Sequence, residues 1–191
     1  MKRIALLLVA VVSFAAAHSQ HIEFKWRGLY ITGGYEYTTN LNKTFYEDKV
    51  AFNGFMVAGG FQFRKETGVG LGAAYLNDPS GAFSQLPIFV ELRSHYLRSR
   101  LTPFTSIYVG YSIPLGASSG GRESIQINRG GVTSGANAGV RFAVNRKFGI
   151  NAYVGYQELY MTRVNRKVDG KWAEGQPLLL HNLKVGVGLN F

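Results

Sequence analysis

Residues 179–191 read LLHNLKVGVGLNF, and this stretch decides the fold. Alternate positions are apolar or aromatic with one histidine among them, while the positions between hold mainly asparagine, lysine and glycine. A period of two places the two sets on opposite faces of an extended chain, which indicates a β-strand with one apolar face. The apolar face carries Leu179, His181, Leu183, Val185, Val187, Leu189 and Phe191.

The same alternation recurs upstream, and no helical period of comparable length competes with it. It predicts eight strands, at residues 28–38, 50–64, 68–76, 86–97, 105–115, 132–144, 148–160 and 179–191. Short connections at 65–67, 98–101 and 145–147 alternate with longer ones at 39–49, 77–85, 117–131 and 163–177. This layout is typical of a membrane-spanning barrel with tight turns at one end and loops at the other.

The two faces predict which side of the sheet meets lipid. A sheet that crosses a bilayer must close, because lipid offers its backbone no hydrogen-bond partners. Eight strands enclose an interior that side chains just fill, so the glycine-rich polar face belongs inside and the apolar face outside. The predicted fold is all-β: an eight-stranded antiparallel up-and-down transmembrane β-barrel with a filled interior.

The first residues have the layout of a secretory signal peptide. Lys2 and Arg3 precede an apolar run, and Ala17-His18-Ser19 fits a cleavage site after small residues. The run from Ile4 to Ala17 falls short of the roughly 20 residues that a spanning helix needs. We therefore predict a cleaved signal peptide at 1–19 and the barrel at 20–191.

The chain carries a formal net charge of +10. Nucleic-acid binding is one interpretation of such a charge, but it requires a basic patch on one face. Here the excess lies round a rim, where it would meet phosphate headgroups, and we expect no nucleic-acid partner. The basic residues at the short turns are Arg64, Lys65, Arg98, Arg100, Arg146 and Lys147.

Odd and even positions along a strand lie on opposite faces, and this parity places several charged side chains inside the barrel. We predict an interior charge network of Glu36, Glu91, Arg93, Arg141 and Lys184. A static plug of salt bridges is favoured over a proton or ion path, because a buried charge without its partner is strongly destabilising. Glu158 has the opposite parity and would need a bulge to face inward. A narrow channel remains an alternative.

Histidine chemistry is the other alternative, since lipid A-modifying barrels use a histidine near the outer leaflet. His181 lies near the loop end on the apolar face, without a serine or acid in 178–184, although Glu158 of another strand could partner it. His95 lies near the turns and points inward. The histidines match no enzyme motif that fits such chemistry. We predict no catalytic residue, no cofactor and no metal site.

The last long connection is the candidate contact surface. Arg166, Lys167, Lys171 and Trp172 form a basic and aromatic mixture that could contact lipopolysaccharide phosphates or a partner protein. The alternative is a solvated hairpin tip, because residues 168–171 read as a turn.

The signal peptide, the alternating strands and the final strand ending Leu189-Asn190-Phe191 resemble the small outer-membrane barrel superfamily that includes the OmpA transmembrane domain and OmpX. The glycine- and tyrosine-rich strands also resemble porin-family barrels of Bacteroidota. The resemblance implies the outer membrane of a Gram-negative bacterium. It also implies that Leu189 and Phe191 form a C-terminal signal for the barrel assembly machinery. We expect no periplasmic peptidoglycan-binding domain after Phe191, so the tether role of OmpA does not carry over.

The resemblance names no specific activity. Its expected partners are outer-membrane lipids, lipopolysaccharide, the assembly machinery and an outer-membrane protein partner. We expect a non-enzymatic barrel that acts in envelope integrity, in surface interaction or as a subunit of an outer-membrane complex.

Overall fold

The computed structural model describes residues 27–42, 51–64, 67–79, 84–97, 99–115, 125–145, 147–168 and 171–191; at 125–128, 163–168, 171–176 and 178 it describes the backbone alone. The predicted signal peptide therefore lies outside the described residues. No helix among the described residues is long and apolar enough to cross a membrane. The strands are β1 (Gly28–Asn40), β2 (Ala51–Arg64), β3 (Thr67–Asn77), β4 (Ser84–His95), β5 (Leu101–Leu115), β6 (Ile125–Arg129), β7 (Gly131–Ala143), β8 (Gly149–Val168) and β9 (Lys171–Asn190).

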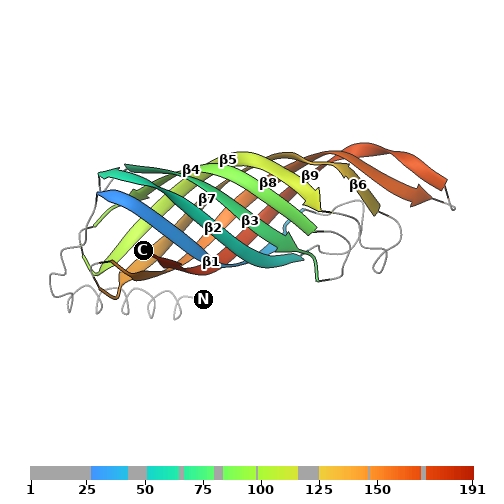
Figure 1. The fold of residues 1–191 in the computed structure, drawn as a ribbon. Coiled ribbons are helices and arrows are strands. Elements are labelled where there is room, and N and C mark those ends of the chain that lie inside the picture. The colour runs from blue at the N-terminus through green and yellow to red at the C-terminus, as the bar shows by residue number, and fades with distance from the viewer. Residues whose placement is uncertain are drawn as a thin grey trace, which may run out of the picture.

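Eight of these strands form a closed antiparallel barrel (Figure 1). The hydrogen-bonded order is β8-β7-β5-β4-β3-β2-β1-β9, and β9 pairs with β8 to complete the ring. β6 lies outside the ring and pairs with the far part of β8. β1 begins and β9 ends at the same end of the barrel (Figure 1). The predicted up-and-down barrel is confirmed.

The seam between β1 and β9 is formed by the stretch that decided the fold. Their pairing runs from Thr32 opposite Asn190 to Asn40 opposite Asn182. Phe191 extends it, because its N–H donates to the Ile31 carbonyl (2.8 Å) and its carbonyl accepts from the Ile31 N–H (3.1 Å). Leu189 and Phe191 are thus exposed at the point of closure, where a fault would leave a sheet edge open. Their role as an assembly signal stays a prediction.

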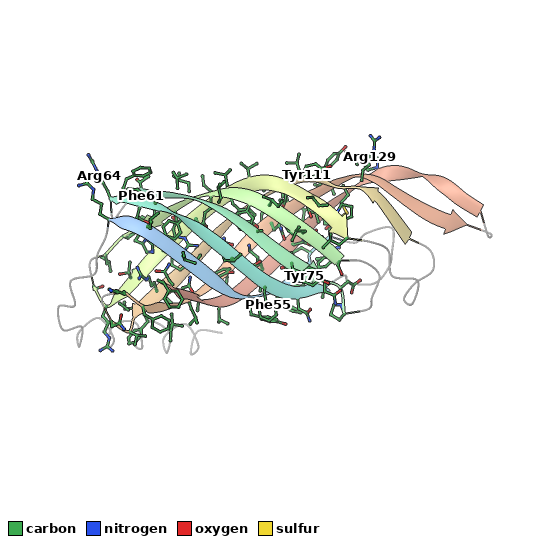
Figure 2. All side chains as sticks on the ribbon, viewed as in Figure 1. Phe55, Phe61, Arg64, Tyr75, Tyr111 and Arg129 are labelled. Carbon is green, nitrogen blue, oxygen red and sulfur yellow. The ribbon has the colours of Figure 1, made fainter. Side chains whose placement is uncertain are left out.

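Apolar and polar side chains separate across the barrel wall as the parity predicts. Phe55, Phe61, Tyr75 and Tyr111 point outward from the ribbon (Figure 2), and all four are exposed. The exposed apolar side chains surround the whole barrel, whereas soluble monomers rarely expose patches larger than a few hundred Å². Such an exposed apolar surface is favourable if hydrocarbon, and not water, surrounds the barrel. Asparagine, threonine, serine and charged residues are buried inside.

Glycines on the inner face make room for inward aromatic rings. A Cβ added to Gly186 would contact the Tyr153 ring, and one added to Gly72 would contact the Phe89 ring. Each ring comes from a strand other than that of its glycine. In both pairs the glycine lies directly opposite the aromatic residue on the neighbouring strand, so these inner glycines leave room for the adjacent rings.

Local hydrogen bonds explain the tight turn between β7 and β8. The Asn145 side-chain oxygen accepts from the backbone N–H groups of Lys147 and Phe148, both at 2.8 Å. The Val144 N–H donates to the Phe148 carbonyl (3.0 Å), which closes the turn from the other side. Asparagine suits this position because its side chain can replace a backbone acceptor.

Two predicted loops are wrong. Residues 163–168 and 171–177 form strands and not a loop, because β8 and β9 continue past the barrel and pair as far as Val168 opposite Lys171. Residues 117–131 include β6 and the start of β7. The alternation failed to reveal the longer strands because register shifts interrupt the β8–β9 ladder between Met161 and Arg166. A bulge changes the face on which the following side chains lie.

Candidate functional site

Two buried ion-pair clusters occupy the barrel interior. In the first, the Glu91 cluster, Arg93 Nη2 donates to Glu91 Oε2 (3.2 Å) and the Tyr30 hydroxyl donates to Oε1 (3.0 Å). In the second, the Glu36 cluster, Lys184 Nζ lies 3.2 Å from Glu36 Oε1, to which the Tyr153 hydroxyl also donates. Each buried carboxylate thus has one basic partner and one tyrosine donor.

Aromatic rings surround the two cations. The Arg93 guanidinium carbon lies 5.5 Å from the ring centre of Tyr30 and 5.4 Å from that of Phe104. Lys184 Nζ lies 4.5 Å from the ring centre of Tyr108. Contacts of this kind add a favourable electrostatic interaction with the ring face. They also take up space along which ions or water would otherwise move.

The structure buries all five residues of the predicted charge network but divides them. Four form the two clusters. Arg141 is buried on β7, where it lies opposite Asn151 of β8. Sequence parity could place these side chains inside, but it could not show which acid meets which base.

The interior near the long loops also holds five large apolar side chains, which sequence interpretation did not single out. We name as the apolar plug these five side chains, each no more than 1% exposed. They are interleaved with polar residues, since the equally buried Thr38, Gln85 and Thr133 lie opposite three of them on neighbouring strands. They belong to one packed cluster of buried residues. The alternation in the sequence already placed such positions on the inner face, since Leu180 shares a face with Asn182 and Lys184. The plug consists of Phe52, Leu76, Leu159, Met161 and Leu180.

A separate cluster of polar side chains lies on the outer face of the barrel, near the loop end. Glu158 and His181 are direct cross-strand partners on β8 and β9, and Glu158 Oε1 lies 3.5 Å from His181 Nδ1. The Tyr156 hydroxyl donates to Glu158 Oε1 (3.0 Å) and is hydrogen-bonded to His181 Nδ1. We call these three residues the outer polar cluster. The ladder is regular from Gly149 to Met161, so Glu158 has no bulge to turn it inward.

The outer polar cluster lacks the order of a hydrolytic triad. Ser134 of β7 lies opposite Glu158, on the side away from His181. A serine nucleophile needs the histidine as its direct partner, with the acid behind the histidine. Here the glutamate separates the two in the row.

The predicted contact residues lie in a projecting hairpin rather than a loop. Arg166 and Lys167 belong to β8, Lys171 and Trp172 belong to β9, and Lys167 pairs with Trp172. This part of β8 and β9 extends beyond the barrel together with β6 (Figure 1). The side chains of the four residues lie outside the described part, so their contacts stay predictions.

Comparison with known proteins gives the family. The profile of the family described as "Outer membrane protein beta-barrel domain" matches residues 4–191. The chain belongs to this family. No curated protein sequence matches the chain. The predicted resemblance to small outer-membrane barrels is confirmed.

Members of the outer-membrane barrel class with solved structures have a similar fold. Neisserial surface protein A (NspA) is 12% identical, with a TM-score of 0.64 over 85% of this chain and 96% of that one. OprG from Pseudomonas aeruginosa is 16% identical, with a TM-score of 0.60 over 89% and 99%. AlkL, determined in lipid bilayers, is 11% identical, with a TM-score of 0.55 over 88% and 90%. At these identities the likeness shows the fold alone.

Proposed function

We propose that this family member is a non-enzymatic and non-conducting barrel of the Gram-negative outer membrane. It acts in envelope integrity, in surface contact or as a subunit of an outer-membrane complex. The observation that carries the proposal is the apolar plug, which lies on the loop side of the two ion-pair clusters.

The plug and the clusters together oppose ion passage. The five plug side chains are almost wholly buried and are packed beside buried polar side chains, so this level of the interior is filled. Behind them, Glu36 and Glu91 each hold a cation and a tyrosine hydroxyl. An ion crossing the barrel would have to displace both arrangements.

The projecting hairpin supports a role in contact outside the membrane. β8 and β9 stay paired past the last partners of β1 and β7, so they present a paired strand extension instead of a loop. Its sequence combines basic residues with Trp172, a composition suited to lipopolysaccharide phosphates or to a protein surface. During biogenesis, the exposed Leu189 and Phe191 at the seam suit recognition by the assembly machinery.

Planar-bilayer recording tests the non-conducting role. We expect no discrete current steps from the purified protein, because the plug closes the interior. A gel run with and without boiling serves as the control, since a mobility shift on boiling identifies folded barrel in the same preparation. Reproducible steps from folded wild-type protein would contradict the proposal and favour a narrow channel.

A further inference from the structure

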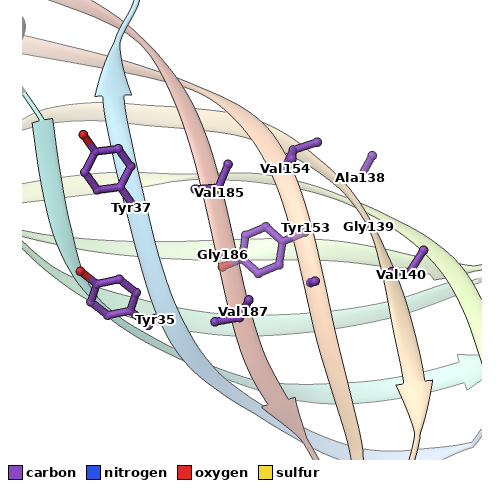
Figure 3. A pocket seen from close by; sticks show the side chains of 11 residues that line it. Tyr35, Tyr37, Ala138, Gly139, Val140, Tyr153, Val154, Val185, Gly186 and Val187 are labelled. Atoms are coloured by element: carbon purple, nitrogen blue, oxygen red, sulfur yellow. The ribbon is translucent and has the colours of Figure 1, made fainter. Parts of the chain in front are cut away.

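An apolar groove of about 590 Å³ runs over the outer face of β7, β8, β9 and β1. Figure 3 shows Tyr35 and Tyr37 beside Val185 and Val187, with Val154 and the β7 side chains on the far side. Almost all of the lining is apolar. The outward side chains that form it are Tyr35, Tyr37, Ala138, Val140, Ala152, Val154, Val185 and Val187.

The strand register explains why this face is hollow. One row across the strands reads Val140, Ala152, Val187 and Tyr35. The next row has the same make-up, with small or branched side chains ending at Tyr37. Tyr35 and Tyr37 therefore bound the groove on β1, while alanines and valines form the floor. The groove is open to its surroundings and lined by apolar atoms, which suits a hydrocarbon chain.

The outer polar cluster lies beyond the groove on the same two strands, where Tyr156 and Leu183 form the next outward row. Val154 lines the groove and Glu158 lies four residues further along β8, about 13 Å at roughly 3.3 Å per residue. The side chains of Glu158 and His181 are 46% and 34% exposed, so a ligand can reach both. In a barrel of this class the loop end faces outward, which puts the cluster near the outer edge of the hydrocarbon.

The chemistry of the cluster favours a cationic hydrogen-bond donor. Tyr156 donates its proton to Glu158, and its hydroxyl is also hydrogen-bonded to His181 Nδ1. Among the described residues, the contacts of the Glu158 side chain use only Oε1, which leaves Oε2 able to accept. A partly exposed carboxylate with an oxygen able to accept complements an ammonium group and disfavours a phosphate.

We infer that the groove and the outer polar cluster bind one lipid molecule with a primary ammonium in its head. One acyl chain lies along the groove between Tyr37 and Val154, and the ammonium lies against the Glu158 carboxylate. The site does not depend on whether the interior conducts.

Native mass spectrometry of the intact barrel in detergent, with equal dioleoyl phosphatidylethanolamine and phosphatidylcholine, tests this site. The two lipids share chains and phosphate, but only the first carries N–H donors. We expect about a tenfold preference for phosphatidylethanolamine, the scale of one hydrogen bond to a charged group. Glu158→Gln should abolish the preference and leave the groove intact.

A second experiment tests the groove by filling it with larger side chains. Ala138→Leu with Ala152→Leu should reduce retention of both lipids several-fold, while Ala73→Leu, an outward alanine on β3, should change nothing. Folding of each variant is checked by its mobility shift on boiling. Wild type without a preference, a preference that survives Glu158→Gln, or full retention by the filled groove overturns the inference. A dimer that the filling variant converts to monomer also overturns it, because the face would then belong to a second copy.

Discussion

Replacing Glu36 with alanine is expected to lower the free energy of unfolding by about 3–5 kcal/mol, because it leaves a buried lysine without its counter-ion. Lys184 Nζ lies 3.2 Å from the Glu36 carboxylate, and both side chains are almost completely shielded inside the barrel. Tyr153 would lose its acceptor in the same variant. Urea titration followed by the mobility shift between folded and unfolded protein measures the change.

A double variant separates the loss of a pair from the loss of a side chain. Glu36→Ala with Lys184→Met removes both charges, and we expect it to recover most of the lost stability, since replacing a buried ion pair by apolar groups is often close to neutral. Glu158→Ala is the matched control on the outer face, where the ion pair is partly exposed and the effect should stay below about 1 kcal/mol. If the double variant is as unstable as Glu36→Ala, the unpaired lysine is not the cause.

Gly186→Leu is expected to destabilise the barrel by roughly 3 kcal/mol or more, the sum of overpacking and a lost hydrogen bond to a charged group. A Cβ at this position would already contact the Tyr153 ring. Leucine must push that ring away from Gly186, which breaks the bond from the Tyr153 hydroxyl to Glu36. The folded fraction in urea reports the effect.

The neighbouring residue supplies the control for Gly186→Leu. Val187 is on the same strand but faces outward, and it is 57% exposed. Val187→Leu should therefore leave the unfolding midpoint nearly unchanged. Equal destabilisation by the two variants would mean that the inner and outer faces of β9 are packed alike, contrary to the structure.

The sequence predicted the barrel wherever lipid selects one face of a strand. Along β9 the alternation from Leu183 to Leu189 reports a hydrocarbon outside and a crowded interior, so both the strand and its orientation could be predicted. The five charged side chains assigned to the interior could be placed by the same parity.

The strands could not be predicted beyond the barrel, where lipid no longer requires one face of a strand to be apolar. The outer parts of β8 and β9 lie beyond the barrel, where both faces can be polar, and register shifts after Met161 break the period of two. A strand there gives no alternation to detect. β6 depends on pairing with this extension of β8 and was missed for the same reason.

The side-chain contacts could not be predicted, because they depend on which strands become neighbours when the barrel closes. The residue pattern along one strand does not contain this information. Glu36 meets Lys184 only because β1 and β9 are joined at the seam. The apolar plug gathers side chains from four strands, so no single strand indicated it. Glu158 was considered as a partner for His181, but only the β8–β9 register places them opposite each other.

Spin-label accessibility on β5 tests most directly that the apolar face meets lipid while the interior is closed. The chain has no cysteine, so single cysteines can be introduced without background. In reconstituted vesicles, labels at Ile107 and Ile113 should collide readily with oxygen, which concentrates in hydrocarbon. Labels at the buried Ser106 and Ser112 should collide little with oxygen or with a water-soluble nickel chelate. Loss of this alternation, or nickel access at the two serine positions, would contradict the proposed closed interior.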